Sequence, residues 1–129
     1  YFLTRNFISK NYKTRVYSCK TIRSSNGMAL SSRNIQLNKV RLKASGLIAN
    51  KLIKLKRSLC TRNGFAKNSS KNSKELIKKM RGNLIEKFNI KIEYLECRNL
   101  MTLTTNLNNK PFKLFVAYYL NNVRLIDNF

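Results

Sequence analysis

Histidine and tryptophan are missing from this sequence of 129 residues, and proline, glycine and acidic residues are scarce. Without histidine, the chain lacks the commonest acid–base catalyst and the commonest metal ligand of proteins. Its apolar runs are all shorter than the ~18 residues of a membrane-spanning helix, and its first residues show no signal-peptide pattern. We therefore expect a cytoplasmic protein without a membrane partner.

Acidic residues are so few that the 27 lysines and arginines leave a formal net charge of +22. Such an excess first suggests nucleic acid, because basic side chains that bind phosphates supply most of the non-specific affinity for it. The lysines come with abundant asparagine, however, and with only one proline and four glycines. That combination is typical of an AT-rich genome. We therefore favour codon bias as the source of the charge and do not expect a nucleic-acid partner.

The three cysteines, Cys19, Cys60 and Cys97, lie far apart and form no CxxC motif. An odd number at such spacings supports neither a zinc site nor a disulfide framework. We expect buried free thiols in a reducing cytosol. Hydrophobic residues make up 43% of the composition, so a chain of this length can bury the core of one globular domain.

The first third of the chain predicts a short helix, a strand and a loop. Apolar residues interleaved with basic ones suit a helix over residues 1–11. The run RVYSC, Arg15–Cys19, predicts a short strand. Residues 20–34 follow neither period and contain the turn-forming run SSNG, which predicts a loop. A helix followed by a strand suggests the tail of an α/β unit that began upstream, and Tyr1 in place of methionine suggests a piece of a longer product.

Two amphipathic helices are predicted next. Apolar residues recur at steps of three and four over residues 37–59, with basic residues on the opposite face. The apolar face consists of Leu37, Val40, Ala44, Leu47, Ile48, Leu52, Leu55 and Leu59. A second apolar face covers residues 76–88, and Asn72 with Glu75 resembles the cap at its start. Residues 61–72 are predicted to form a polar connector.

The last third predicts three strands. Residues 90–97 alternate at their start, and residues 112–120 are apolar on both faces, as in a covered central strand. The run VRLI, residues 123–126, would return after a tight turn at Asn121–Asn122. Residues 99–111 are predicted to be a loop. Two helices followed by three strands predict a small α+β module in which the helices cover an antiparallel sheet.

Side chains on these strands offer little catalytic chemistry. Glu93 and Glu96 lie three apart on a strand, so they should point to opposite faces and make a poor acid–base pair. Arg124 and Asp127 are expected to form a structural ion pair or a capping interaction. A cluster of aromatic residues could stack on bases, but core packing is the better interpretation because both faces of that strand are apolar. The cluster consists of Phe112, Phe115, Tyr118 and Tyr119.

The stretch GMALSSRNIQL, residues 27–37, has the chemistry to bind a polyphosphate. Serine hydroxyls and successive backbone N–H groups can donate to phosphate oxygens as an anion-binding nest, and Arg33 adds a forked cationic donor. The start of the following helix would add its positive dipole end. The alternative is an ordinary polar connector whose serines bond to the backbone. On chemistry alone the connector is favoured, because Ser-Ser-Arg is common by chance.

Three motifs, in this order along the chain, resemble a known family. NGMALSSRNIQL, residues 26–37, resembles the DGLAMSSRN-x-YL signature of pantothenate synthetase, also called pantoate–β-alanine ligase. IKIEYLECRNL, residues 90–100, resembles the V-x-V-D-Y-L-E strand of that family, and VRLIDN, residues 123–128, resembles its TRLIDN ending. The resemblance covers residues 14–129, and the matching separation of the motifs makes the polyphosphate interpretation of the loop much stronger than chemistry alone does.

This resemblance implies a cytosolic, usually homodimeric ligase. In such an enzyme ATP and Mg²⁺ activate the carboxylate of (R)-pantoate as pantoyl adenylate, with release of pyrophosphate, and the amine of β-alanine then attacks to give pantothenate and AMP. By the same resemblance, residues 1–27 would be the last piece of a Rossmann-like nucleotidyltransferase domain. Residues 28–129 would form a C-terminal α+β lid, which makes the whole an α/β protein.

The resemblance also assigns site residues. The residues in contact with ATP would be Leu30, Ser31, Ser32 and Arg33. Of these, Ser32 and Arg33 would stabilise charge while the α-phosphate is attacked, a role similar to that of the KMSKS loop in class I aminoacyl-tRNA synthetases. Ile22 would contact the adenine end through its backbone. No metal ligand is assigned to this chain.

The departures from the family pattern lie outside the Ser-Ser-Arg core. Asn26 replaces an aspartate, Cys19–Lys20 replaces an apolar–proline pair, and Asn121–Asn122 replaces a turn that contains glycine. The H-x-G-H motif, the pantoate-binding glutamines and the lysine–aspartate pair of the family would lie upstream of Tyr1, so this chain alone should not catalyse the reaction. Two alternatives stay open: a basic nucleic-acid-binding module derived from the lid, and a decayed enzyme that has kept its fold.

Overall fold

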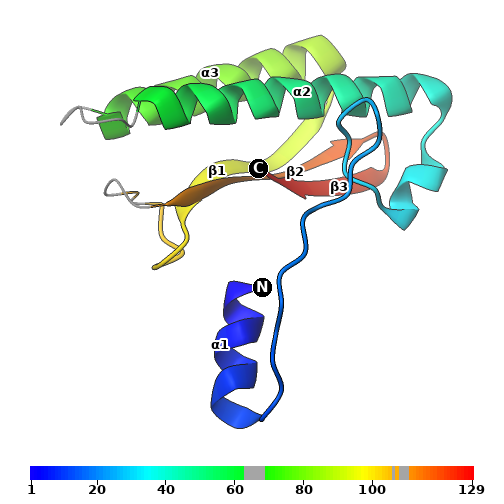
Figure 1. Ribbon diagram of the computed structural model, residues 1–129. Helices are drawn as coiled ribbons and strands as arrows, with labels where there is room; N and C mark the ends of the chain where they lie inside the picture. Colours follow the sequence, from blue (N-terminus) through cyan, green and yellow to red (C-terminus); the bar gives the residue numbers. More distant parts are fainter. Residues whose placement is uncertain (63–68, 106, 108–110) are drawn as a thin grey trace.

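The computed structural model describes residues 1–62, 69–105, 107 and 111–129. Its elements, in chain order, are helix α1 (Phe2–Asn11), the short 3-10 helix η1 (Ser32–Gln36), helix α2 (Lys39–Arg62), helix α3 (Ser69–Phe88) and strands β1 (Lys91–Asn99), β2 (Phe112–Leu120) and β3 (Val123–Asn128). Helices α2 and α3 lie on one face of the sheet, whereas α1 stands apart at the end of an extended segment (Figure 1). This arrangement confirms the predicted α/β fold class, with two helices on an antiparallel sheet.

The three strands pair antiparallel in the order β1-β2-β3, so residues 112–120 form the central strand as predicted. Leu120 pairs with Val123 across a tight turn, and Asn121 takes a positive φ of 55° there. Asparagine tolerates this left-handed conformation better than most residues do. The structure therefore confirms the predicted hairpin, with Asn121 in the left-handed conformation.

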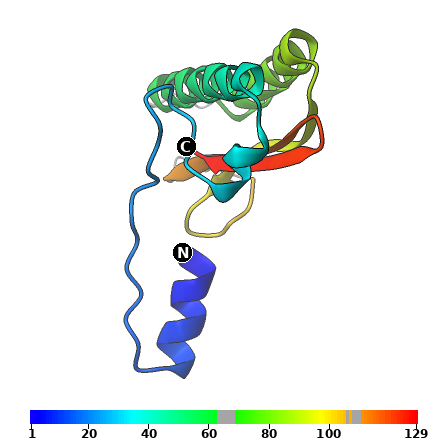
Figure 2. The same cartoon turned by 90° about the vertical axis from the view of Figure 1, so that its right-hand side faces the viewer.

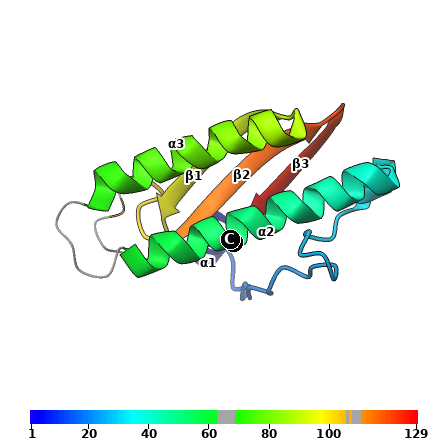
Figure 3. The same ribbon diagram turned by 90° about the horizontal axis from the view of Figure 1, so that it is seen from above.

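The hydrophobic core lies between the sheet and the helix pair, and the two helices run side by side over all three strands (Figure 3). Each fully buried aliphatic side chain in this layer contributes about 1.5–3 kcal/mol through removal of apolar surface from water. The fully buried aliphatic side chains include Ile48, Leu52, Leu59, Leu84, Leu114, Val116 and Leu120. Burial of these residues is what orients α2 and α3 on the sheet.

Helix α2 confirms the predicted amphipathic helix but not every residue of its apolar face. Val40 and Leu47 are 72% and 55% exposed, whereas Ser45 is fully buried. Ser45 Oγ donates to Leu42 O at 2.9 Å and contacts Met28 Sδ. The first turns of α2 therefore pack against the preceding loop rather than against the sheet, which rotates the buried face away from the pattern that the sequence predicts.

Two predictions about helices and strands before the sheet are wrong. Arg15–Cys19 is extended but forms no strand within the described residues, since no other strand lies beside it. Helix α3 begins at Ser69, so Asn72 lies inside the helix and is not its N-cap. The predicted connector is also shorter than expected, because α2 continues to Arg62. Residues 63–68 of that connector lie outside the described residues.

The cysteines are free, but only Cys97 is buried, in β1. Cys19 and Cys60 are exposed, so the prediction of buried thiols is wrong for these two. None of the helices in the described part of the chain is both long and apolar enough to cross a membrane.

Candidate functional site at the edge of the sheet

The segment before η1 folds back on itself as a closed loop. Arg23 and Ala29 form an antiparallel bridge, and Leu30 N donates to Ile22 O at 3.0 Å. Gly27 has φ of 88° at the tip, a conformation that favours glycine. The chain then continues into η1, which lies beside the edge strand β3 (Figure 2). The region predicted as a loop is therefore locally ordered by its own hydrogen bonds.

Asn26 fastens this loop to α2. Its Oδ1 accepts hydrogen bonds from Ser24 Oγ at 2.6 Å and from Met28 N at 3.1 Å. Its Nδ2 donates to Leu42 O at 3.2 Å, and its backbone oxygen accepts from Asn50 Nδ2 at 3.0 Å. An aspartate, as in the family pattern, could not donate to Leu42 O. The asparagine that departs from the pattern thus makes a contact of its own.

Asn26 packs directly against Gly46 of α2. A Cβ atom at Gly46 would lie 2.6 Å from Asn26 Cγ, closer than carbon atoms approach. A role for this glycine was not predicted from the sequence. The available signal was a lone glycine within a helical pattern, which usually marks a close packing contact.

The Ser-Ser-Arg motif occupies the start of η1. Ser31 is the N-cap, with extended backbone, and its Oγ accepts from Arg33 N at 3.3 Å. In that respect Ser31 bonds to the backbone, as the connector interpretation expects. The side chains of Ser32 and Arg33 are exposed, and no hydrogen bond to the Ser32 hydroxyl or the Arg33 guanidinium occurs within the part of the chain that the structure describes. Both groups are therefore available to a ligand.

Helix α2 does not contribute its N-terminus to this motif. It begins at Lys39, beyond η1, and Asn38 Oδ1 caps it by accepting from Arg41 N at 2.9 Å. The helix that the motif itself begins is the short η1, and α2 starts six residues beyond Arg33.

A cleft of about 470 Å³ runs along β3 beside this motif. Leu30, Ser31 and Arg33 lie in its wall, whereas Ile22 and Ser32 are not among its lining residues. Arg33 therefore faces the sheet across a space large enough for part of a nucleotide. The sheet and C-terminal side of the wall consists of Tyr94, Phe115, Tyr118, Arg124, Leu125, Ile126, Asp127, Asn128 and Phe129.

Asn34 is a lining residue that the sequence analysis did not single out. Its Nδ2 donates to Ala29 O at 3.0 Å, which fixes the orientation of the amide. Its Oδ1 is buried and lacks a hydrogen-bond partner among the described residues. A buried acceptor left without a donor costs about 1–3 kcal/mol. A bound ligand with an N–H or O–H group could relieve that cost.

The predicted ion pair between Arg124 and Asp127 does not form. Arg124 donates instead to Glu93, at 2.7 and 3.0 Å. Asp127 accepts from Arg23 at 2.7 and 2.9 Å. Residues three apart on a regular strand point to opposite faces. The period of the strand, applied to VRLIDN, would have excluded the predicted pair.

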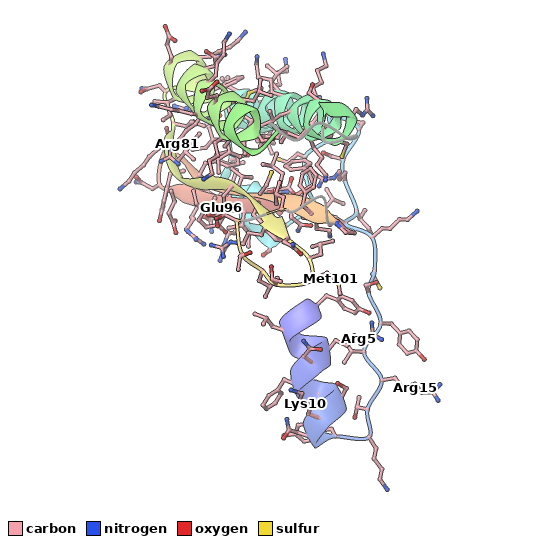
Figure 4. The ribbon with its side chains drawn as sticks, turned by 90° about the vertical axis from the view of Figure 1, so that its left-hand side faces the viewer. Arg5, Lys10, Arg15, Arg81, Glu96 and Met101 are labelled. Atoms are coloured by element: carbon pink, nitrogen blue, oxygen red, sulfur yellow. The ribbon has the colours of Figure 1, made fainter. Side chains whose placement is uncertain are left out.

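The predicted placement of Glu93 and Glu96 on opposite faces is also wrong. β1 has a bulge at Glu93, which shifts the alternation and brings both carboxylates to the face away from the helices. Each bonds to its own arginine, since Glu96 (labelled in Figure 4) accepts from Arg98 at 2.7 Å. The hydrogen bonds from Arg124 lower the pKa of Glu93. Both groups therefore form ion pairs, and the two carboxylates are not an acid–base pair.

The aromatic cluster of β2 is only partly core. Tyr118 is buried, and this burial raises its pKa. Phe115 and Tyr119 are half-buried because they lie on the face of β2 that α2 and α3 do not cover, whereas Phe112 is half-buried and packs against the core. The core-packing prediction holds for Tyr118 and Phe112, whereas the expectation of a strand covered on both faces is wrong. Phe115 and Tyr118 also line the cleft.

Comparison with known proteins identifies a family whose members are similar to this chain. The family model described as Pantoate-beta-alanine ligase matches residues 2–129. The pantothenate synthetase of Flavobacterium psychrophilum is 29% identical over 130 residues, which cover 98% of this chain and 43% of that protein. The pantothenate synthetase of Clostridium botulinum is 36% identical over 124 residues, which cover 92% of this chain and 40% of that protein.

A solved structure shares the fold. Pantothenate synthetase from Thermus thermophilus superposes with a TM-score of 0.77 at 22% identity, over 99% of this chain and 44% of that one. The fold is therefore that of the C-terminal part of a pantothenate synthetase. Together with the match over residues 2–129, this means that the chain belongs to the pantoate–β-alanine ligase family. It spans about two fifths of the length of the curated relatives named above.

Proposed function

We propose that this chain is the nucleotide-loop and lid portion of an ATP-dependent ligase that joins (R)-pantoate to β-alanine through pantoyl adenylate. The observation that carries the proposal is Arg33. Its guanidinium is exposed and lies in the wall of the cleft, and no described residue bonds to it. A free guanidinium fork beside a hydroxyl-bearing turn is suited to a polyphosphate.

The proposed chemistry has two steps. A carboxylate oxygen of pantoate attacks the α-phosphorus of ATP, and the bond to pyrophosphate breaks. Arg33 and the Ser32 hydroxyl donate to phosphate oxygens on which charge grows, so they stabilise the transition state more than the ground state. The amine of β-alanine then attacks the acyl carbon, and AMP leaves. Leu30 would also contact ATP, and the backbone of Ile22 would contact the adenine end; both residues are exposed, at 58% and 73%.

Mg²⁺, which the family implies, is assigned no ligand among the residues that the structure describes. The described residues contain no group of three or more His, Cys, Asp or Glu side chains that could hold a metal ion. The residues present therefore do not fit a protein-held Mg²⁺ site, and we assign them no step through the ion.

We further propose the domain division given by the family resemblance, with residues 1–27 belonging to a Rossmann-like domain and residues 28–129 forming the lid. Exposed apolar side chains before the loop support it, since Leu3, Phe7 and Tyr17 are 68%, 60% and 76% exposed. Side chains of this kind are usually covered by other protein surface. The rest of such a protein would supply the H-x-G-H motif. The whole enzyme would be a cytoplasmic homodimer.

The test is a single-turnover assay of pantoate-dependent pyrophosphate release by the protein as its gene encodes it. Arg33→Ala should slow this release about 100-fold, as the loss of one transition-state donor does. The thermal midpoint should not change, because the side chain is exposed. Arg33→Lys keeps the charge and loses the fork, so its rate of pyrophosphate release should lie between those of the wild type and Arg33→Ala.

Pyrophosphate release by Arg33→Ala at the wild-type rate would contradict the role given to this residue. If the wild-type protein itself releases no pyrophosphate in the presence of ATP and pantoate, the proposed ligase activity is wrong. Tight binding to RNA that weakens steeply with salt would then favour the nucleic-acid alternative.

A further inference from the structure

Arg23 joins residues 22–30, which we call the nucleotide loop, to the last residues of β3 and to Phe129. Its Nη1 donates to Gly27 O at 3.0 Å and to Asp127 Oδ2 at 2.7 Å. Its Nη2 donates to Asp127 Oδ1 at 2.9 Å and to Asn128 O at 3.0 Å. The guanidinium carbon also lies 4.6 Å from the ring centre of Phe129. One side chain thus connects the tip of the loop with β3 and the C-terminal residue.

The position of Arg23 in the loop makes this connection relevant to the Ser-Ser-Arg motif. Arg23 bridges Ala29, and Leu30 N donates to Ile22 O at 3.0 Å, so the two limbs of the loop move together. Leu30 directly precedes Ser31, the N-cap of η1. A displacement of Arg23 therefore displaces the start of the motif.

The surroundings of the Arg23–Asp127 pair favour a strong interaction. The side chains are 23% and 10% exposed, whereas those of the Arg124–Glu93 pair, which joins β3 to β1, are 37% and 41% exposed. Partial burial reduces screening by water and salt. The Arg124–Glu93 pair connects two strands that already belong to one sheet. The Arg23–Asp127 pair instead attaches a loop whose β-bridge lies within the loop itself.

We infer that Arg23 and Asp127 are a positioning pair that holds residues 30–33 over the cleft in the geometry needed for adenylate formation. The inference rests on the proposed function and adds two residues that act through the loop. The carboxylate of Asp127 orients the arginine, the arginine holds the loop, and the loop presents Arg33. The last strand and the nucleotide loop therefore act as one unit in the reaction.

The first arm of the test is hydrogen exchange of the backbone amides of Ser24, Gly27 and Leu30, each of which donates a hydrogen bond within the loop. Asp127→Asn should speed their exchange about tenfold or more, the effect expected from loss of a charge-assisted hydrogen bond. Glu93→Gln is the matched control, because it makes the same chemical change in an arginine-bound carboxylate that does not touch the loop. Equal effects of the two variants on these amides would overturn the inference.

The second arm is steady-state kinetics of the protein as its gene encodes it. Asp127→Asn should lower kcat for pantoate-dependent pyrophosphate release about tenfold with the KM for pantoate unchanged, because misplacement of the loop affects the transition state at the triphosphate. Arg23→Lys should restore part of the kcat that Arg23→Ala loses. Wild-type kcat in Asp127→Asn, despite faster loop exchange, would reduce the pair to a structural contact and overturn the inference.

The two arms separate this inference from the proposed function. If the wild-type protein releases no pyrophosphate, the ligase proposal fails and the inferred role in adenylation fails with it. The exchange comparison then still decides whether the pair holds the loop. If the wild-type protein is active, a failure of Asp127→Asn to differ from wild type in either arm counts against the pair alone.

Discussion

The core under the helices and the loop at the β3 edge are held by different forces. Between α2, α3 and the sheet, apolar side chains such as Ile48 and Leu114 are fully buried. At the edge, the loop is held by hydrogen bonds of Arg23 and Asn26 to backbone atoms and to Asp127. Apolar burial is non-directional, whereas hydrogen bonds fix positions. The first region can therefore set stability while the second sets the geometry of a site.

The largest expected effect concerns two adjacent residues of α2. Ile48 is fully buried and Leu47 is 55% exposed. Ile48→Ala should lower the free energy of unfolding by about 2–5 kcal/mol, since it leaves a cavity in the core. Leu47→Ala should change it by about 0.5 kcal/mol at most. Urea denaturation of both variants measures the difference, and similar losses in the two would contradict the placement of the core.

A smaller effect is expected where the loop rests on α2. Gly46→Ala would place a Cβ atom against Asn26, whose hydrogen bonds keep it from moving away. We expect a loss of about 1–3 kcal/mol in the free energy of unfolding. Gly82→Ala is the matched control in α3, where nothing lies within 4 Å of the added atom.

Alanine at Gly82 should stabilise the protein by up to about 1 kcal/mol through helix propensity. Thermal melts of the two glycine variants should therefore shift in opposite directions. A stabilising Gly46→Ala would show that the loop does not pack on α2 as described.

The last prediction concerns the three thiols, which differ in burial. Burial raises the pKa of Cys97 from 9.0 to about 11, whereas Cys19 and Cys60 are exposed. Between about pH 9 and pH 11 the unfolded chain loses the Cys97 proton that the folded chain keeps, so stability falls as pH rises. Iodoacetamide at pH 9 should label Cys19 and Cys60 but leave Cys97 unmodified until the protein is unfolded. Equal labelling of all three under native conditions would contradict the burial of Cys97.

Much of the core could be predicted from the sequence, because periodicity directly records which residues face apolar surroundings. The order of two helices and three strands and the central position of residues 112–120 followed from it, whereas the turn at Asn121 followed from the turn chemistry of the asparagine pair. The exposure of Val40 and Leu47 could not be predicted from periodicity. The start of α2 packs against a loop, and periodicity carries no information about the position of that loop. Asn72 was misplaced because a capping pattern can occur by chance inside a helix.

The site was predictable in part. Ser31 and Arg33 were found by their chemistry and by family resemblance, and both line the cleft. Arg23 and Asp127 were missed because their pairing joins residues far apart in the chain, which no local pattern reports. The faces of Glu93 and Glu96 were wrong because a bulge, which the alternation of residues 90–97 does not reveal, shifted the register.

The most direct test of the account measures pantoate-dependent pyrophosphate release in a single turnover and the thermal midpoint in the same two variants. Arg33→Ala should release pyrophosphate about 100-fold more slowly with an unchanged midpoint. Ile48→Val, which removes one methylene from the core, should lower the midpoint and leave the rate unchanged at temperatures where the protein is folded. Wild-type release by Arg33→Ala would contradict the claim that the loop at the β3 edge acts on the nucleotide.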